Sequence, residues 1–436
     1  MRPGTREHGA HSARPEKGGG GHRVTSDTGV PVDLQDERLI RRQGLRGEVA
    51  GFVAQVRNGD IGSLPVIVGL AIIWGVFQAL NPFFLSSANL VNLAIECAAV
   101  GIISIGVVLV LLVAQIDLSV GSMSGVASAI LGVGLTRHGW SVPTAIVVAL
   151  LVGAFVGFIY GYVFVKFGVP SFVSTLAGLL ALLGLQLQIL GTNGSINIPF
   201  DSWIVRFAQQ MFLPVWLSHV LATGAAALYA ASQLARVRRR SRAGLSSRST
   251  TGIALRVGLL LIVLNGSAWY LNQTRGIGLP FVLFVSLVVI LNFVLTRTRW
   301  GRAVYAVGGS VEAARRAGIK VSRIYVSVFM LGTMLATCGG LLAAGRLATA
   351  SISSGVGDTN LNAIAAAVIG GTSLFGGRGH AYSALLGIAV IASISSGLTL
   401  LSLDSSIRFM ITGAVLMIAV IVDSLSHRSR VAHGRA

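Results

Sequence analysis

The sequence has few charged residues and only two cysteines. Of its 436 residues, 11% are charged, 53% are hydrophobic and 55 are glycine. In an ordinary soluble domain roughly a quarter of the residues are charged, so this composition argues against a soluble globular protein. Cys97 and Cys338 lie within apolar runs, and we interpret them as small buried hydrophobic residues. They support neither a disulfide framework nor a metal site.

Among the charged residues, acidic ones are in the minority. The chain has 15 Asp and Glu against 34 Lys and Arg, which gives a net charge of +19. In a soluble chain this excess would suggest a nucleic-acid partner. Here the basic residues stand between long uncharged runs, which is typical of a membrane protein whose loops are held on one side. We therefore expect a lipid bilayer and no nucleic acid around this chain.

Apolar runs long enough for membrane-spanning helices occupy residues 63–424, which we expect to form one transmembrane domain. The fold predicted is an all-α polytopic membrane protein with about 12 transmembrane helices. The segment 360–373 is short and glycine-rich enough to be re-entrant or broken. The twelve candidate runs are 64–80, 90–113, 119–135, 142–165, 171–191, 214–233, 256–272, 279–295, 323–345, 360–373, 381–399 and 406–423.

The flanking segments and the distribution of Lys and Arg predict the orientation. Residues 1–62 have mixed charge and no apolar run, so we expect a disordered cytoplasmic tail and no cleaved signal peptide; residues 425–436 form a second cytoplasmic tail. If both ends are cytoplasmic, 19 basic residues of the membrane part and its C-terminal tail lie inside and 5 lie outside. The positive-inside rule therefore selects an N-in, C-in topology.

Residues for catalysis are missing. A phosphate-binding loop needs Gly-Lys-[Ser/Thr], yet none of the three lysines, Lys17, Lys166 and Lys320, follows a glycine. The membrane part also has no close carboxylate pair, no histidine pair at metal spacing and no G-x-S-x-G elbow. We expect no enzyme, cofactor or metal site, and hence a transporter, a channel or a scaffold.

A first polar motif, AQIDLSVGS, occupies residues 114–122. An ionisable residue beside a membrane span is costly, so Asp117 needs a partner or a cavity. One interpretation is that Asp117 or Ser119 caps the helix that starts near Val120. Another is that the segment ends a half-helix and lines a polar pathway, with Gln115, Asp117 and Ser119 as pathway residues. The two interpretations are compatible.

A second motif, residues 360–379, begins with two asparagines and ends in a glycine-rich run. Gly370, Gly371, Gly376 and Gly377 indicate either tight helix packing or irregular backbone at a pathway. Asn360 and Asn362 carry the amide donors and acceptors that a neutral polyol substrate needs.

A third motif predicts a short helix in the loop 296–323. Ser310 suits the N-cap, Glu312 the first turn, Arg315 and Arg316 the last turn, and Gly318 the position after the helix. Two turns alone are marginal in water, so the helix should dock. It contacts either a separate cytoplasmic protein, which we favour, or the lipid headgroups.

Together these motifs resemble the permease family of ATP-binding-cassette sugar importers of the ribose, xylose and galactose type. That family carries the runs IDLSVGS, GR.IYAIGGN.EAAR..GI and LDAIAA.VIGGTSL.GG in this order. Here they are matched at 116–122, 301–319 and 361–377, and residues 169–178 match a fourth run. The likeness covers residues 63–424.

The resemblance implies partners and a location in the cell membrane (plasma or inner membrane). Two permease subunits, as a homodimer, would form the pathway, and an extracytoplasmic sugar-binding protein would deliver the sugar. A cytoplasmic ATPase with two nucleotide-binding modules would bind ATP and magnesium, so this chain would need no cofactor. The coupling helix that enters the ATPase would comprise Ser310, Glu312, Ala313, Ala314, Arg315 and Gly318.

The family looks like ten-helix permeases, whereas this chain has an additional helix pair, an insert at about 205–272. This insert resembles the D-xylose permeases, so we expect D-xylose or a related pentose as substrate. The sequence departs from the family pattern at Gln115, Ser310 and Asn362, where Glu, Asn and Asp are common. Two carboxylates are thereby lost, which weakens any ion-coupled role.

Two other functions stay open at this stage. A secondary transporter driven by protons or sodium would need a titratable relay, for which the spans offer only Glu96 and Asp117. A membrane scaffold would use the short loop helix but gives no reason for polar motifs within the spans.

Overall fold

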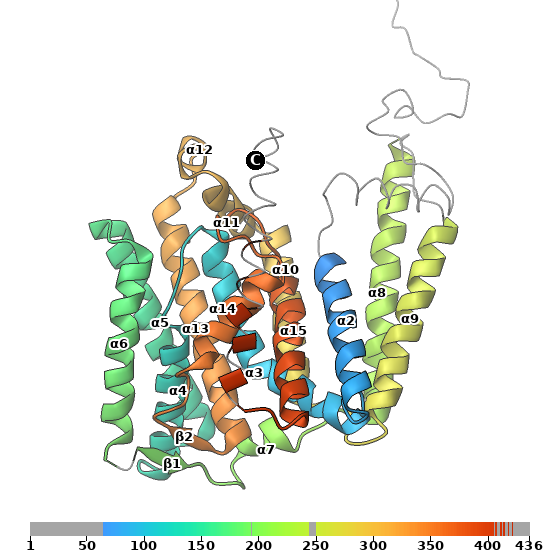
Figure 1. Cartoon of the computed structure of the whole chain (residues 1–436). Helices are drawn as coiled ribbons and strands as arrows, with labels where there is room; N and C mark the ends of the chain where they lie inside the picture. Colours follow the sequence, from blue (N-terminus) through green and yellow to red (C-terminus); the bar gives the residue numbers. More distant parts are fainter. Residues whose placement is uncertain are drawn as a thin grey trace, which may run out of the picture.

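The computed structural model describes residues 64–192, 194–243 and 250–404 and scattered residues between 406 and 421. Within this part the chain forms fourteen helices and two short strands (Figure 1). The helices are α2 (Leu64–Leu80), α3 (Ser87–Leu112), α4 (Val120–Thr136), α5 (Val142–Phe167), α6 (Ser171–Leu190), α7 (Trp203–Gln209), α8 (Val215–Arg242), α9 (Thr250–Leu271), α10 (Leu279–Arg297), α11 (Arg299–Gly309), α12 (Val311–Arg316), α13 (Val321–Leu347), α14 (Asp358–Ile369) and α15 (Ala381–Leu400). The strands are β1 (Ser195–Asn197) and β2 (Thr349–Ser351).

Most of the predicted membrane spans coincide with helices. Among the described residues, eight helices are long and apolar enough to cross a membrane, and α2 and α4 are shorter apolar helices of 17 residues each. The predicted run 360–373 corresponds to α14, whose 12 residues extend only about 18 Å, less than the roughly 30 Å of a hydrocarbon core. The run 406–423 lies largely outside the described residues, so the total of about 12 stays a prediction.

The helix α13 is the hub of the bundle, with α3, α4 and α5 packed around it (Figure 1). Its contact with α5 is made by Gly153, Gly157 and Gly161, which lie four residues apart and so share one face. A Cβ atom on Gly157 would lie 2.5 Å from the carbonyl oxygen of Phe329. The hydroxyl of Thr333 donates a hydrogen bond of 2.7 Å to the carbonyl oxygen of Gly153. The two backbones therefore touch directly.

The contact of α13 with α3 is equally close. A Cβ atom on Gly106 would lie 2.6 Å from the carbonyl oxygen of Gly332, and one on Gly339 would lie 2.6 Å from that of Ala99. Small residues permit such approach in membranes, where apolar burial gives helices little reason to associate. Accordingly, α3 is the most buried candidate span, with 89% of its apolar window buried.

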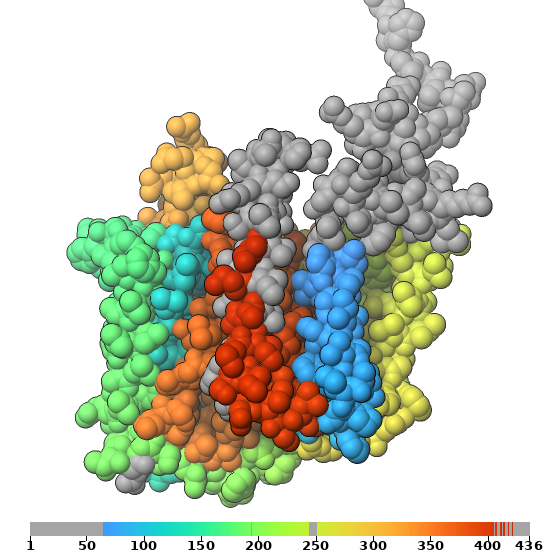
Figure 2. Space-filling model, viewed as in Figure 1, coloured from blue at the N-terminus to red at the C-terminus, as the bar shows by residue number. Residues whose placement is uncertain are grey.

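A small cap closes one end of the bundle. Strands β1 and β2 pair antiparallel, with Ser195 opposite Ser351 and Asn197 opposite Thr349. The helix α7 packs beside them on the end of α13, where a Cβ atom on Gly345 would lie 2.9 Å from the carbonyl oxygen of Ile204. The helix α12 protrudes from the opposite end, as Figure 2 shows. The cap and α12 therefore define two ends of the molecule.

The helices α8 and α9 form a hairpin at the edge of the bundle (Figure 1). Asn272 donates a hydrogen bond of 2.7 Å to Ser218, and His219 and Asn265 are 3.0 Å apart, so polar pairs join the two helices. Tyr270 donates to the carbonyl oxygen of Leu85 at 2.9 Å and attaches the hairpin to the bundle. The hairpin covers most of the expected insert at about 205–272, although α7, which overlaps the start of that range, packs on α13.

Replacing Gly157 by Leu should destabilise the fold by about 2 kcal/mol or more, because the new side chain would overlap the backbone of α13. Thermal unfolding of the purified protein in detergent measures the effect. The matched control is Gly184→Leu in α6, where an added Cβ meets no atom within 4 Å. Equal unfolding temperatures for the two variants would contradict the packing role of Gly157.

Candidate functional site

The candidate site is built around residues 113–119, a non-helical segment between α3 and α4. Ala114 has a φ of 57°, in the left-handed region that residues other than glycine rarely adopt. Backbone that leaves the helix within a membrane protein must find its hydrogen bonds elsewhere. All four sequence motifs contribute to this segment or its surroundings.

Asp117 is 2% exposed and is held by Ser119. Its Oδ1 accepts hydrogen bonds from the backbone N–H of Ser119 at 2.8 Å and from the Ser119 hydroxyl at 2.7 Å. Its Oδ2 is buried and has no hydrogen-bond partner within the described part of the chain. Of the two residues predicted to cap α4, Ser119 does not do so, because its hydroxyl donates to Asp117 instead of accepting from the first turn. Asp117 accepts from the backbone N–H of the N-cap residue Ser119 and from none in the first turn of α4 within the described residues.

The fourth motif supplies hydroxyl groups that hold the segment from the side of α6. The Ser171 hydroxyl accepts from the backbone N–H of Ile116 at 3.3 Å. The Thr175 hydroxyl accepts from the N–H of Leu118 at 3.2 Å and lies 3.4 Å from the carbonyl oxygen of Ile116. We did not identify either residue as functional from the sequence, although the family run at 169–178 contains both.

The asparagine motif holds the segment from the other side. The Asn360 side-chain amide donates a hydrogen bond of 2.9 Å to the carbonyl oxygen of Leu118. A Cβ atom on Gly121 would lie 2.9 Å from the Cβ of Asn360, so the start of α14 and the start of α4 are in close contact. Asn360 therefore braces the backbone of the first motif.

The glycines after α14 divide into two physical roles. Gly370 and Gly376 are close-packed: a Cβ on Gly370 would overlap the carbonyl oxygen of Ser383, and one on Gly376 would lie 2.6 Å from the Cβ of Ala114. Gly371, in contrast, has open space and a φ of +99°, which favours glycine. Close packing therefore occurs at Gly370 and Gly376, and left-handed backbone occurs at Gly371 and also at Gly376, which has a φ of +81°. A role of this irregular backbone at a pathway stays a prediction.

The short helix α12 has the predicted boundaries. The Ser310 hydroxyl accepts from the backbone N–H of Ala313 at 3.2 Å, and Gly318 follows the helix with a φ of +79°. Glu312 and Arg315 lie 3.7 Å apart and are 72% and 64% exposed. The capped helix is confirmed, and the role of its exposed charges stays a prediction. Ala314 is buried, whereas Ala313 is exposed on the same turn.

The helices α11 and α12 are connected to the irregular segment through the glycine run. Gly377 donates its N–H to the carbonyl oxygen of Leu112, at the end of α3, at 2.9 Å. Gly308 of α11 packs against the same carbonyl group. Tyr305 of α11 donates its hydroxyl to the carbonyl oxygen of Gly379 at 2.8 Å. The second and third motifs therefore meet at the end of the helix that leads into the first.

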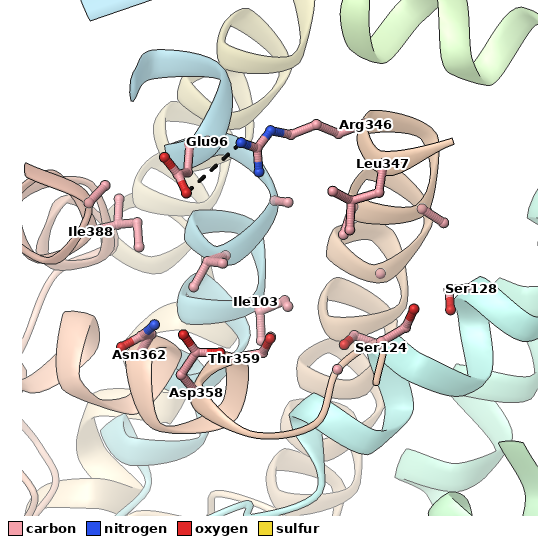
Figure 3. Close-up of a pocket in the computed structure, with 18 of the residues that line it drawn as sticks. Glu96, Ile103, Ser124, Ser128, Arg346, Leu347, Asp358, Thr359, Asn362 and Ile388 are labelled. Carbon is pink, nitrogen blue, oxygen red and sulfur yellow. Dashed lines mark ion pairs between the residues drawn. The ribbon is translucent and has the colours of Figure 1, made fainter. Parts of the chain in front are cut away.

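A cavity of about 260 Å³ lies between α3, α4, α13, α14 and α15 (Figure 3). Its polar lining combines carboxylates, a guanidinium, an amide and hydroxyl groups, from Glu96, Arg346, Asp358, Asn362, Ser124 and Thr359 among others. Glu96 and Arg346 lie 3.9 Å apart, and Figure 3 shows them on the opposite side of the cavity from Asn362 and Asp358. The ion-pair partners are 250 positions apart in the sequence, which explains why the sequence did not reveal them as a pair.

The five predicted pathway residues do not share this cavity. Asn362 lines it, whereas Gln115, Asp117, Ser119 and Asn360 do not. Asp117, Ser119 and Asn360 instead stabilise the irregular backbone, as described above. The side chain of Gln115, which lies within the irregular segment, donates a long bond of 3.5 Å to the carbonyl oxygen of Val113. The residues that line the cavity come mainly from five helices. Of these lining residues, the sequence motifs had indicated Asn362 alone as a pathway residue.

Comparisons of the sequence with known proteins identify the family of the chain. The sequence matches the family described as "Branched-chain amino acid transport system / permease component" over residues 89–420, and the chain belongs to this permease family. It is therefore a multi-pass membrane protein. No solved structure matches the chain.

Curated relatives narrow the resemblance. The xylose transport system permease protein XylH of Escherichia coli K12 is 36% identical over 346 residues, 79% of this chain and 87% of that protein. The fructose import permease protein FrcC of Rhizobium meliloti is 31% identical over 404 residues, 92% of this chain and 94% of its own length. The ribose import permease protein RbsC of Bacillus subtilis is 30% identical over 366 residues, 84% of this chain and 94% of that protein.

Replacing Thr175 by Val should destabilise the protein by about 1–3 kcal/mol, because the N–H of Leu118 loses its acceptor while the side-chain volume is kept. The matched control is Thr337→Val, since that buried hydroxyl, among the described residues, bonds within its own helix, to the carbonyl oxygen of Thr333 at 2.9 Å. Thermal unfolding in detergent compares the two. An unfolding temperature in Thr175→Val no lower than in the control would show that the Thr175 hydroxyl does not support the segment.

Proposed function

We propose that this chain is the membrane-spanning permease subunit of an ATP-binding-cassette importer that translocates a monosaccharide, D-xylose or a related pentose. The observation that carries the proposal is the 36% identity to a xylose transport permease over 79% of the chain. ATP would be hydrolysed on a separate subunit, which binds ATP and magnesium, and this chain would have no ATPase site or cofactor of its own.

The cavity supports a neutral, hydroxyl-rich substrate. A sugar offers many hydroxyl groups, each a donor and an acceptor. Asp358 and Glu96 provide acceptors, Arg346 provides donors, and Asn362 provides both. Because the hydroxyl groups of Ser124 and Thr359 lie in the same cavity, few of a sugar's hydroxyl groups would be left unpaired there. We infer that the pathway passes through this cavity and that Asp117, Ser119 and Asn360 stabilise the irregular backbone of the segment 113–119.

The helix α12 is suited to act as the coupling helix. Its charged side chains are exposed, and its N-cap makes it a rigid unit despite its length of six residues. A force on α12 would reach α11, the glycine run and the carbonyl group of Leu112 through the contacts described above. These contacts lead to the segment 113–119, and the chain also continues from α12 into α13, which lines the cavity.

The same scheme defines the orientation and the partners. The N-in, C-in topology would place α12 at the cytoplasmic surface, where the ATPase with its two nucleotide-binding modules would bind. The cap of β1, β2 and α7 would then face outward, toward a sugar-binding protein. A second copy of the permease would complete the pathway. The basic residues in the last turns of α5, α8 and α10, which include Lys166, Arg239 and Arg297, fit this orientation.

The partners of Glu96 and Asp117, the two acidic residues that the sequence offers for a relay, favour ATP-driven transport over ion coupling. A proton or sodium relay needs titratable groups that can change partners along a path. Here Glu96 is paired with Arg346, and Asp117 is bonded to Ser119. These two carboxylates are engaged with different partners, and they belong to different structural units, the cavity and the irregular segment.

The importer function is tested by sugar uptake into vesicles that contain this chain with its ATPase and sugar-binding protein. We expect labelled D-xylose to accumulate only with ATP and to do so equally well after the proton and sodium gradients are collapsed. Uptake that continues without ATP and stops when the proton gradient is removed would overturn the importer function in favour of a secondary transporter.

Replacing both Glu312 and Arg315 by Ala should reduce ATP-driven uptake by about tenfold or more, if these two belong to the few central residues of an interface whose truncation costs about 1 kcal/mol or more each. Both side chains are exposed, so membrane insertion and stability should stay unchanged. The control variant replaces Arg297 and Arg299, two exposed arginines of the same loop outside α12. Uptake reduced equally in the two variants would show that α12 has no special role as the contact.

A further inference from the structure

The end of α8 carries a dense cluster of arginines that the proposed transport function does not use. Residues 236–242 read RVRRRSR, and the side chains of Arg236, Arg238, Arg239 and Arg242 are exposed. Between Asp201 and Glu312 the sequence contains no acidic residue at all. The hairpin of α8 and α9 therefore has no carboxylate of its own to balance this charge.

The length of α8 places these arginines at the surface of a bilayer. Its 28 residues extend about 42 Å, whereas the hydrocarbon core is roughly 30 Å thick. The 20 residues from Val215 to Leu234 are enough to cross that core and contain no charged residue. The remaining eight residues, 235–242, would extend about 12 Å further, through the layer of the lipid headgroups.

Three of the four arginines lie on the side of α8 that faces away from α9, and Arg236 lies at the edge of that side. At about 100° per residue, Arg236, Arg239, Arg242 and Arg238 follow one another around one continuous side of the helix. The opposite side carries Gln233 and Ala226, which are buried, and His219, which pairs with Asn265 of α9. Arg238, Arg239 and Arg242 thus point away from the hairpin's internal contact, and the exposed Arg236 lies at its edge, in line with Ser218.

Lipid is the natural neighbour of this side. Only 11% of the apolar window of α8 and 17% of that of α9 are buried, against 89% for α3. Leu228 and Ile262 are 74% and 72% exposed, and the hairpin stands at the edge of the bundle in Figure 1. Since the apolar surface of the hairpin would be covered by acyl chains, the groups next to its basic end would be the headgroups of the same lipids.

We propose that Arg236, Arg238, Arg239 and Arg242 form a binding site for the anionic headgroups of phospholipids in the leaflet on the α12 side. A guanidinium group binds a phosphate through two parallel hydrogen bonds and stays charged at any physiological pH. A cluster of four to eight basic residues where a spanning helix leaves the membrane attracts anionic lipid. The site depends on the chain being a membrane protein and is independent of which solute it transports.

The test measures lipid binding to the intact chain, purified in neutral detergent, by native mass spectrometry. The probes are phosphatidylglycerol, phosphatidylcholine and glycerol 3-phosphate. Phosphatidylglycerol should bind about tenfold tighter than phosphatidylcholine, its binding should weaken as salt is raised, and glycerol 3-phosphate should not compete at equal concentration. Competition by glycerol 3-phosphate would indicate a free-phosphate site and overturn the lipid assignment.

Three variants locate the site. R236Q/R238Q/R239Q/R242Q should bind phosphatidylglycerol about tenfold or more weakly, whereas Lys at the same four positions should keep binding within about threefold because the charge is retained. The matched control R297Q/R299Q/R302Q/R323Q removes four exposed arginines from α10, α11 and α13 and should leave binding unchanged.

The Lys variant and the measurement in detergent keep the test valid if the Gln variant inserts in the wrong orientation. Equal binding by the parent chain and the Gln variant would overturn the proposal. So would a parent chain that shows no preference for anionic lipid, as expected if an acidic protein segment occupies the arginines instead.

Discussion

The direct backbone contact of α13 with α3 and α5 is the interaction on which the other features of this permease depend. Glycines at 106, 153, 157, 161, 332 and 339 remove the side chains that would otherwise separate these helices. In a bilayer such closeness provides dispersion contacts and short hydrogen bonds, exemplified by Thr333 to the carbonyl oxygen of Gly153, where apolar burial provides little. The positions of α4, of the irregular segment and of the cavity follow from this hub.

The position of the irregular segment 113–119 depends on the packing of α3 against α13. Because α3 is held against α13, its last residue, Leu112, lies at a defined place, and the chain that follows must satisfy its backbone groups away from water. Thr175, Ser171 and Asn360 do so from α6 and α14. Gly377 and Gly308 meet the carbonyl group of Leu112 from the side of α11. The segment is thus a junction between the cavity-lining helices and α12.

Much of the secondary structure was predictable because its signals are local. Apolar runs located α2, α5, α10 and α15 within a few residues, and the cap of α12 was predicted correctly from Ser310 and Gly318. The side-chain roles were less accessible. Nothing in the sequence around Ser119 indicates that its hydroxyl donates to Asp117. The sequence likewise does not distinguish the glycines of α5 that pack on α13 from glycines in other membrane helices, because the difference lies in the helix that they contact. The sequence did not reveal the cavity either, because its lining residues come mainly from five helices that lie in two distant parts of the chain.

The sequence by itself determined that this chain is a helical membrane protein of the sugar-permease type with one short, capped loop helix. The helical membrane architecture and the loop helix depend on apolar length, on charge distribution and on cap residues, all of which act over a few turns. The sugar-permease type was indicated by the resemblance of four short runs to that family. The tertiary structure alone decided that Asn360 braces Leu118 while Asn362 lines the cavity, and that Glu96 meets Arg346. Such assignments depend on which face of a helix meets which neighbour, and backbone contacts between distant glycines set that choice.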